Sequence, residues 1–555
     1  MTTKNNFLSH TEYEEILETL HELLAQEHVV VLGGEAGSGK TTLARSFVER
    51  FQAEYQHIIW IDAATPELLL CSVQALSADE RMFTRPLPAD IEGITACIQD
   101  WALHLPQSLL VLDHVQLADP ESPEYAQFGG SATQRPAAHM LLLPAANTRP
   151  ADIAYLPLQP FDTQTGTRFV VSQAQHLDTQ TCSEDISPTM LASAGELARE
   201  LQGLPLPLLL ASRLLALTSM DFSAYLAAYR DLPEPAMRTT DEASAITALT
   251  LELILQHLAH SSPPARAMLT CGALLAPQPI PPALFEQPAL LPVLFSDLPA
   301  GDQQASRLGD IREALQTLLA TGLLEETAGS DELSMPRQVH ALLRTTLSTE
   351  QALSISEALS LACLQLAQAQ TRETPTLYLL LAGHIRALAV WYDGPTEATE
   401  KVAEAFAWAA SLLHEINLPR ESVQLLHAAL MIWERTLGPV HPTIAGTLTH
   451  LALLHARLQE YRAAEIHATS AITTTSQALG INHPKVLYGL LVLSQIYLQQ
   501  GKHQQARLCL EKALSTGDVV GLQQHPYYKD VQRQLEALHQ KDFDKIDGIT
   551  RVEPE

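Results

Sequence analysis

Short apolar runs alternate with stretches of helical spacing along the first 165 residues. Such runs are typical of the buried strands of a parallel sheet joined by crossover helices. Strands are predicted over residues 29–32, 57–62, 108–113 and 140–143. Helices are predicted over residues 11–24 and 42–51, and in the second of these Leu43, Phe47 and Phe51 form one apolar stripe. The pattern therefore predicts an α/β domain.

Helical spacing dominates beyond residue 165. Residues 166–235 are predicted to be helical, with Gly203 and Pro205 as interruptions. Residues 240–348 alternate helical runs with a short hairpin pattern at 322–335. Helices that flank a small hairpin are typical of a winged-helix domain.

The chain repeats itself beyond residue 395. A Leu-Gly-x-x-His-Pro motif at 437–442 returns at 479–484 and, in divergent form, as Gly-Leu-x-x-His-Pro at 521–526. Its histidines are therefore 42 residues apart. Small residues also recur, as at Ala464 and Ala506, where they let two helices approach closely. This period predicts a helical solenoid of the tetratricopeptide type, in a long form that resembles the repeats of kinesin light chains.

The repeated histidines, His441, His483 and His525, each precede a proline suited to the first turn of a helix. Because they lie one whole repeat apart, we interpret them as turn residues and not as metal ligands. A helical solenoid presents a concave face that binds a protein or peptide segment. Degenerate helices at 351–370 and 375–392 are predicted to join the repeats to the preceding domain.

Composition narrows the classes of protein that are compatible with the chain. Its six cysteines have no paired spacing, which argues against a zinc site or a disulfide framework and favours a reducing compartment. No apolar run reaches the roughly eighteen residues of a spanning helix, and no secretory leader is apparent, so we expect a cytoplasmic protein without a membrane partner. A net charge of −29 without a basic cluster argues against direct binding of nucleic acid.

One motif carries specific chemistry. Residues 34–41, Gly-Glu-Ala-Gly-Ser-Gly-Lys-Thr, match the phosphate-binding pattern G-x-x-x-x-G-K-[ST] between a predicted strand and a predicted helix. Backbone N–H groups and a helix N-terminus hold phosphate in such a loop, while the lysine reaches the β- and γ-phosphates and the threonine hydroxyl ligates Mg²⁺. The predicted contacts come from Gly34, Gly37, Ser38, Gly39, Lys40, Thr41 and Thr42. The sequence thus predicts ATP or ADP with Mg²⁺ as cofactor.

A second carboxylate motif supports this prediction. The apolar strand at 108–113 ends in Asp113, the position of the aspartate that orients Mg²⁺ beside such a loop. Many strands end in an aspartate, so this signal depends on Lys40 upstream; together Lys40 and Asp113 are the candidate catalytic pair. The next residue is His114, where ATPases of this class usually carry a second acid. Slow or absent hydrolysis is therefore expected, and His114 itself is interpreted as a surface-loop residue without a role.

The order of these motifs resembles the NB-ARC branch of the STAND (signal transduction) NTPases over about residues 10–345. The resemblance rests on the loop at 34–41, HIIWIDA at 57–63, LLVLDHV at 109–115 and GLPLPLLL at 203–210. It implies that Pro205 packs against the adenine, although by itself a proline in a first helical turn is simply structural. It also implies that His340, in Val339-His340-Ala341, contacts the β-phosphate of ADP and latches a closed form.

Two features depart from that family. In that family the strand that corresponds to residues 140–143 runs into Thr-Thr-Arg, whose arginine senses the γ-phosphate. Here residues 144–149 read Pro-Ala-Ala-Asn-Thr-Arg. Either Arg149 senses the γ-phosphate from a displaced position, or no residue does. The second acid is also missing after Asp113.

The winged-helix segment 311–324 has Arg312 as its only basic residue, which argues against DNA binding. By resemblance this module folds back on the nucleotide instead.

The predicted fold class is multidomain, a P-loop parallel α/β sheet followed by a helical domain, a winged helix and a tetratricopeptide-type α-solenoid. The predicted boundaries are 1–165, 166–238, 239–348, linker helices 349–395, repeats 396–545 and a tail 546–555. Only 33 residues precede the loop, so no upstream effector domain is expected.

The predicted function is an intracellular signalling switch, closed with ADP and open with ATP, whose repeats sense a protein or peptide. By resemblance it forms a nucleotide-driven homo-oligomer. The alternative is an interaction scaffold that holds the nucleotide as a static ligand, and the charge balance argues against a third possibility, a transcription regulator.

Overall fold

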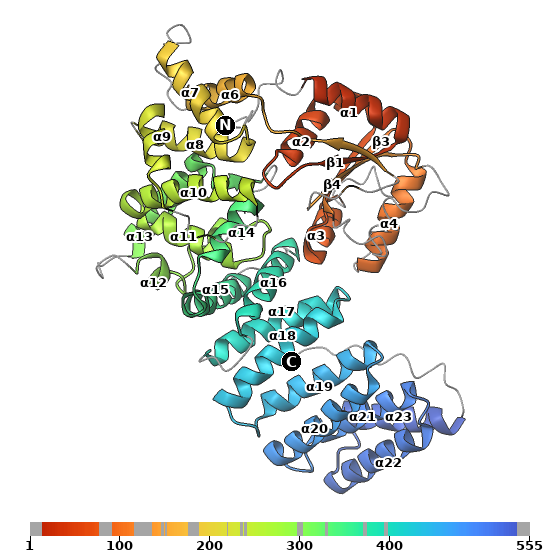
Figure 1. Cartoon of the computed structure of the whole chain (residues 1–555). Helices are drawn as coiled ribbons and strands as arrows, with labels where there is room; N and C mark the ends of the chain where they lie inside the picture. The colour runs from red at the N-terminus through yellow and green to blue at the C-terminus, as the bar shows by residue number, and fades with distance from the viewer. Residues whose placement is uncertain are drawn as a thin grey trace. The chain divides into compact units, whose positions relative to one another are not determined.

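The computed structural model describes residues 14–76, 91–115, 136–145, 149, 153–175, 188–218, 220–233, 237, 241–296, 304–327, 331–369, 375–392 and 398–540. The chain divides into two compact units, residues 1–387 and 388–555. Figure 1 shows both, with labels on most of their helices and on some strands of the first. The predicted tail, 546–555, lies outside the described residues.

A five-stranded parallel sheet, in the order β2-β3-β4-β1-β5, forms the start of the first unit. Its strands are β1 (Val29–Gly33), β2 (His57–Asp62), β3 (Ser108–Val115), β4 (His139–Pro144) and β5 (Ala154–Pro157). The predicted parallel α/β sheet is confirmed. The prediction of four strands was incomplete, because β5 is a short edge strand that ends in proline and is only partly buried. It therefore lacks the apolar run that marks a central strand.

Helices cover both faces of this sheet. On one face α1 (Glu14–Glu27) and α2 (Lys40–Phe51) pack through leucines and Phe47 onto Val30 and Leu32 of β1 and onto alternate residues of β3 and β4. The intervening strand residues, such as Val31, are also fully buried, and α3 (Pro66–Leu76) and α4 (Ile91–His104) lie on that side (Figure 1). Because the strands are parallel, their carboxyl ends meet at one edge.

The rest of the first unit is helical apart from one small hairpin. The helices after the sheet are α6 (Thr163–Gln175), α7 (Pro188–Glu200), α8 (Pro205–Leu217), α9 (Phe222–Arg230), α10 (Glu242–Ser261), α11 (Pro263–Leu274), α12 (Leu291–Leu294), α13 (Gln304–Thr321), α14 (Arg337–Thr345), α15 (Thr349–Ala369) and α16 (Pro375–Ala389). Short 3₁₀ turns occur at η2 (Gln52–Glu54) and η3 (Pro282–Leu284), whereas a third, η4 (Val390–Tyr392), belongs to the second unit. The antiparallel hairpin of β6 (Glu325–Glu326) and β7 (Leu333–Ser334) lies between α13 and α14, so the helix, hairpin and helix expected of a winged helix follow in order.

Among the described residues, α15 alone is by itself long and apolar enough to cross a membrane, and 56% of its most apolar window is buried within the protein. The pair α8 and α9 passes the same test only together, across a bend of 119°. Core helices of globular proteins commonly have these properties.

The second unit is a stack of helical hairpins. Its helices are α17 (Glu400–Glu415), α18 (Pro419–Thr436), α19 (Pro442–Arg457), α20 (Tyr461–Leu479), α21 (Pro484–Gln499), α22 (His503–Val520) and α23 (Pro526–Gln540), with neighbours in sequence packed as pairs (Figure 1). Ala464 and Ala506 are fully buried, as their predicted role at close helix approaches requires.

The repeated histidines start three of these helices. The Nδ1 atoms of His441, His483 and His525 each accept the backbone N–H two residues further on, at 3.2–3.3 Å. Each ring therefore satisfies one of the free N–H groups at a helix N-terminus. Their interpretation as turn residues is confirmed.

Candidate functional site

The loop between β1 and α2 has a backbone that only glycine adopts readily. Gly34, Gly37 and Gly39 have φ values of 146°, 76° and 90°. A Cβ atom at Gly34 would lie 2.6 Å from Ser38 Oγ, and one at Gly37 would collide with the side chain of Gln338. The loop is thus closely packed, and Gly39 leads directly into the N-terminus of α2, where Thr42 lies in the first turn.

Lys40 and Thr41 place two functional groups beside this loop. The Lys40 ammonium donates to the carbonyl oxygens of Gly34 and Glu35, at 2.8 and 3.0 Å. Burial lowers the pKa of Lys40, and the charges of Asp113 and Glu35 only partly offset that effect. The Thr41 hydroxyl donates to Asp113 Oδ1 at 3.3 Å. The two predicted Mg²⁺ ligands, which are 72 residues apart in sequence, therefore lie in contact.

Asp113 is part of a charged group at the carboxyl edge of the sheet. β2 and β3 are in register so that Asp62 lies beside Asp113. Burial raises the pKa of Asp113, which is 3% exposed, and the neighbouring Asp62 raises it further, against the lowering effects of His114, Thr41 and Arg337. Burial also acts to raise the pKa of Asp62, but a hydrogen bond from His114 and the charges of His114 and Arg337 outweigh it and lower this pKa. A buried carboxylate of this kind favours a cation beside it.

His114 is not the surface-loop residue that was predicted. It is the seventh residue of β3, at an irregularity in the pairing with β4, and its φ of 62° turns the chain there. Its Nδ1 lies 3.2 Å from Asp62 Oδ1 and 3.5 Å from Asp113 Oδ1. The bulge turns the His114 ring toward the carboxylates where the regular alternation of a strand would turn it away.

The Gly-Leu-Pro segment approaches the loop from the helical domain. Pro205 is buried at the first position of α8, and the neighbouring Leu206 is the side chain closest to Gly37 after Gln338. Gly203 has a φ of 68°, and a Cβ there would collide with the backbone carbonyl of Phe161. The turn before α8 therefore requires glycine, and it holds the start of the helix against the phosphate-binding loop.

Helix α14, which follows the β6–β7 hairpin in sequence, brings two side chains to the phosphate-binding loop and the carboxyl edge of the sheet. Arg337 Nη2 lies 3.7 Å from Asp62 Oδ1 and 3.5 Å from the carbonyl oxygen of Pro277. Burial lowers the pKa of Arg337, against the charges of Asp62 and Asp113. The side chain of Gln338, which is 7% exposed, lies against Gly37. Sequence reasoning missed Asp62, Arg337 and Gln338, although a basic residue three positions before His340 was a visible signal.

The two predicted residues that depended on the resemblance lie as follows. His340 is buried on α14, and its Nε2 is 2.9 Å from the carbonyl oxygen of Leu275, so the ring is already hydrogen-bonded within its own domain. The Arg149 guanidinium lies 5.5 Å from the ring centroid of Tyr155 on β5. The Tyr155 ring in turn covers Gly33, the last residue of β1. The nucleotide contacts of His340, Pro205 and Arg149 stay predictions.

The residues present fit a bound phosphate group. The hydroxyl of Ser38 and the amide oxygen of Gln338 are buried, and neither has a hydrogen-bond partner among the described residues. Buried polar atoms of this kind are costly unless something satisfies them. With the close glycine backbone, the Lys40 ammonium and the contact between Thr41 and Asp113, they make a polar cradle suited to a nucleotide phosphate with Mg²⁺.

The repeats are identified by comparison with known families. Residues 409–443 and 443–516 match two family models, each described as a tetratricopeptide repeat. The predicted repeats are confirmed over this stretch, and repeats of this type bind protein segments. No curated protein matches the chain in sequence.

Several solved structures are similar to the chain. A STAND protein with a tetratricopeptide repeat sensor from Pyrococcus horikoshii has 15% identity and a TM-score of 0.39, with 95% of this chain and 80% of that one covered. A Walker-type ATPase of Pyrococcus abyssi has 16% identity and a TM-score of 0.31, over 60% and 95%. BtubC (BKLC) from P. vanneervenii has 15% and 0.23, over 38% and 96%.

Proposed function

We propose that this protein is a cytoplasmic, nucleotide-dependent switch whose phosphate-binding loop holds ATP or ADP with Mg²⁺ and whose tetratricopeptide repeats bind a protein or peptide. Lys40 and the loop backbone bind the phosphates, and Thr41 with Asp113 holds the metal. When bound, Mg²⁺ neutralises phosphate charge and the charge of the buried Asp113 carboxylate.

A single observation carries the proposal. Three separate segments meet at the loop: the Thr41–Asp113 contact from the sheet, Leu206 from α8, and Gln338 from α14. A change in the ligand bound at the loop therefore acts directly on contacts made by α8 and α14, which lie outside the sheet domain. Arg337 adds a charge on α14 that pairs with Asp62 at the same edge. A ligand that prefers one arrangement of α14 shifts the population of the two forms.

Slow or absent hydrolysis is part of the proposal. At the position after Asp113, His114 pairs with Asp62 and Asp113 and supplies no carboxylate to activate water. Arg149, the candidate γ-phosphate sensor, has its guanidinium over the ring of Tyr155. The switch then depends on exchange of ADP for ATP, with ADP, Pro205 and His340 stabilising the closed form. Assembly into a homo-oligomer when ATP is bound completes the proposed cycle.

Binding of ADP and of ATP to the full chain tests the first part. With Mg²⁺ present, Lys40→Ala is expected to lower the affinity at least about a hundredfold, because a charge-assisted contact in a buried site is lost. Lys401→Ala, an exposed substitution on α17, is the matched control and should bind like the wild type. Wild-type protein with no affinity for adenine nucleotides would overturn the proposal.

Hydrogen exchange of α14 tests the switch. Peptides that cover Arg337–Thr345 are expected to exchange at different rates with ADP and with ATP, and Arg337→Gln should reduce that difference while nucleotide still binds. The alternative, a scaffold with a static nucleotide, is favoured by the absence of a second acid after Asp113. It predicts that bound nucleotide does not exchange and that α14 behaves identically with either nucleotide.

A further inference from the structure

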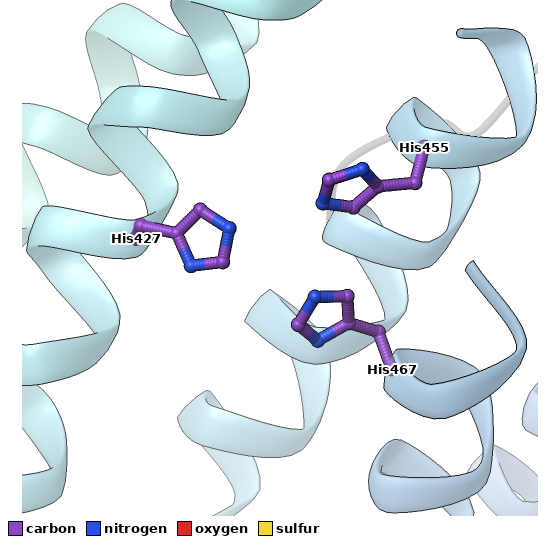
Figure 2. A group of neighbouring side chains, drawn as sticks. All are labelled: His427, His455 and His467. Atoms are coloured by element: carbon purple, nitrogen blue, oxygen red, sulfur yellow. The ribbon is translucent and has the colours of Figure 1, made fainter. Parts of the chain in front are cut away.

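Three histidines from three helices of the repeat unit converge on one point. His427 lies on α18, His455 near the end of α19, and His467 on α20. One ring nitrogen of each lies within 4.8 Å of the corresponding nitrogens of the other two. Figure 2 shows the three rings facing a common centre from separate helices. Their spacing in sequence, 28 and 12 residues, matches no metal-binding motif, which is why the sequence pattern does not reveal them.

The middle ring is held in the tautomer that a metal ligand needs. His455 Nδ1 lies 2.7 Å from Glu460 Oε2. Since a carboxylate only accepts, Nδ1 carries the hydrogen and Nε2 of the neutral ring carries the lone pair. A histidine that donates its second N–H to a carboxylate is the usual outer arrangement around a protein-bound metal.

The lone-pair nitrogen of His455 has nothing else to bind. His455 is 8% exposed, and its Nε2 is buried without a hydrogen-bond partner among the described residues. The His467 ring stacks on His455 with 5.2 Å between centroids and 12° between planes. The centroid of the His427 ring lies 6.0 Å from that of His455 and 5.6 Å from that of His467. An unsatisfied buried acceptor is costly unless a hydrogen-bond donor or a cation takes its lone pair, and a cation is the partner that several imidazoles can share.

Burial disfavours the protonated form of the other two rings. Burial lowers the pKa of His467 to about 4, and the neighbouring His455 and His427 add to the effect. Burial lowers the pKa of His427 too, with a smaller contribution from His455. A metal binds the unprotonated form of histidine, which is the form that burial favours in both rings.

We propose that His427, His455 and His467 form a binding site for Zn²⁺ that links the α17–α18 hairpin to the α19–α20 hairpin. Imidazole nitrogens suit zinc, and three of them leave a fourth position open. In a tetrahedral site with Zn–N bonds of about 2.0–2.1 Å the nitrogens lie about 3.3 Å apart. The three rings reach that separation by side-chain rotation, chiefly of His427, which is half-buried and less enclosed than His455. The fourth coordination position of the zinc is available to water or to a donor atom from a bound protein segment.

Cobalt provides the direct test, because Co²⁺ in a three-histidine site has a visible absorption band. The full chain, stripped of metal with a chelator, is titrated with Co²⁺ and separately with Zn²⁺, in millimolar Mg²⁺ so that the phosphate-binding loop does not compete. The wild type is expected to bind one equivalent of each. His427→Ala should bind at least about a hundredfold more weakly, because loss of a direct ligand costs at least as much as loss of an outer partner, and Glu460→Gln about tenfold more weakly.

Controls separate ligand loss from misfolding. His503→Ala, an exposed histidine substitution on α22, should keep wild-type affinity. Metal-free His427→Ala should keep the helical content and melting temperature of the metal-free wild type, since His427 is only half-buried; His427→Asn replaces it if it does not. Zn²⁺ should raise the melting temperature of the repeats in the wild type and in His503→Ala, but not in His427→Ala or His427→Asn. The proposal is wrong if the wild type shows no cobalt band, or if His427→Ala binds either metal as tightly as the wild type.

Discussion

The ion pair between Glu67 and Arg386 ties α16 to the sheet domain within the first unit. Glu67 lies in the first turn of α3 and is fully buried, and Arg386 lies near the end of α16, 319 residues later. Arg386 Nε and Nη2 donate to the two carboxylate oxygens at 2.8 and 3.0 Å. Such a bidentate pair is strong and geometrically specific. Arg386→Met keeps most of the apolar stem but leaves the carboxylate without its cation.

The loss of stability expected for Arg386→Met follows from the burial of the two partners. Removing one partner of a buried ion pair costs about 3–5 kcal/mol, because the other charge is left uncompensated. The Arg386 side chain is 29% exposed, so water reaches that end, and we expect a loss of about 3 kcal/mol, at the low end of that range. The double variant Glu67→Met with Arg386→Met removes the buried charge as well and is expected to lose no more than about 1 kcal/mol.

Hydrogen exchange of peptides from β1 and α3 in increasing urea measures the stability of the first unit separately from the repeats. Arg230→Met is the matched control, because Arg230 pairs with Glu196 and Glu200 on an exposed surface and its loss should change stability little. If Arg386→Met costs less than about 1 kcal/mol, or if the double variant is no more stable than the single one, the reasoning from a buried pair fails.

Three other sites have expected outcomes. In the same urea experiment, Gly203→Ala should cost about 3 kcal/mol or more, because a Cβ collides with backbone there; Gly322→Ala, with a similar φ but only ordinary contacts, should cost about 1–2 kcal/mol. Burial lowers the pKa of His384 to about 4, so as pH falls from 6.5 to about 4 the unfolded chain gains a proton that the folded chain does not, and the first unit should lose up to about 3 kcal/mol. His384→Gln should flatten that pH dependence, and an equally steep profile would refute the assignment. Burial raises the pKa of Asp113, so Asp113→Asn in EDTA should raise the melting temperature while Mg²⁺ no longer increases nucleotide affinity; a lower melting temperature would contradict this.

Elements that depend on local pattern could be predicted closely. Four strands, the helix after the phosphate-binding loop and the repeats lie within a few residues of their predicted positions, because apolar period and glycine or proline punctuation act over short stretches. β5 could not be found this way, since an edge strand of four residues is stabilised by pairing with β1 and not by its own pattern. His114 was misplaced for a related reason, because a bulge in β3 changes where its side chain points.

The phosphate-binding loop is encoded in eight consecutive residues, so the linear chain already specifies its glycines, Lys40 and Thr41. The approach of Arg337 and Gln338 to that loop is different, because it depends on how α14 packs against a loop about 300 residues earlier in the chain. The three histidines of the repeat unit are a second case, since they meet only through the packing of α18, α19 and α20. Side-chain contacts between distant segments are set by the positions of whole helices, and those positions follow from burial of the complete core.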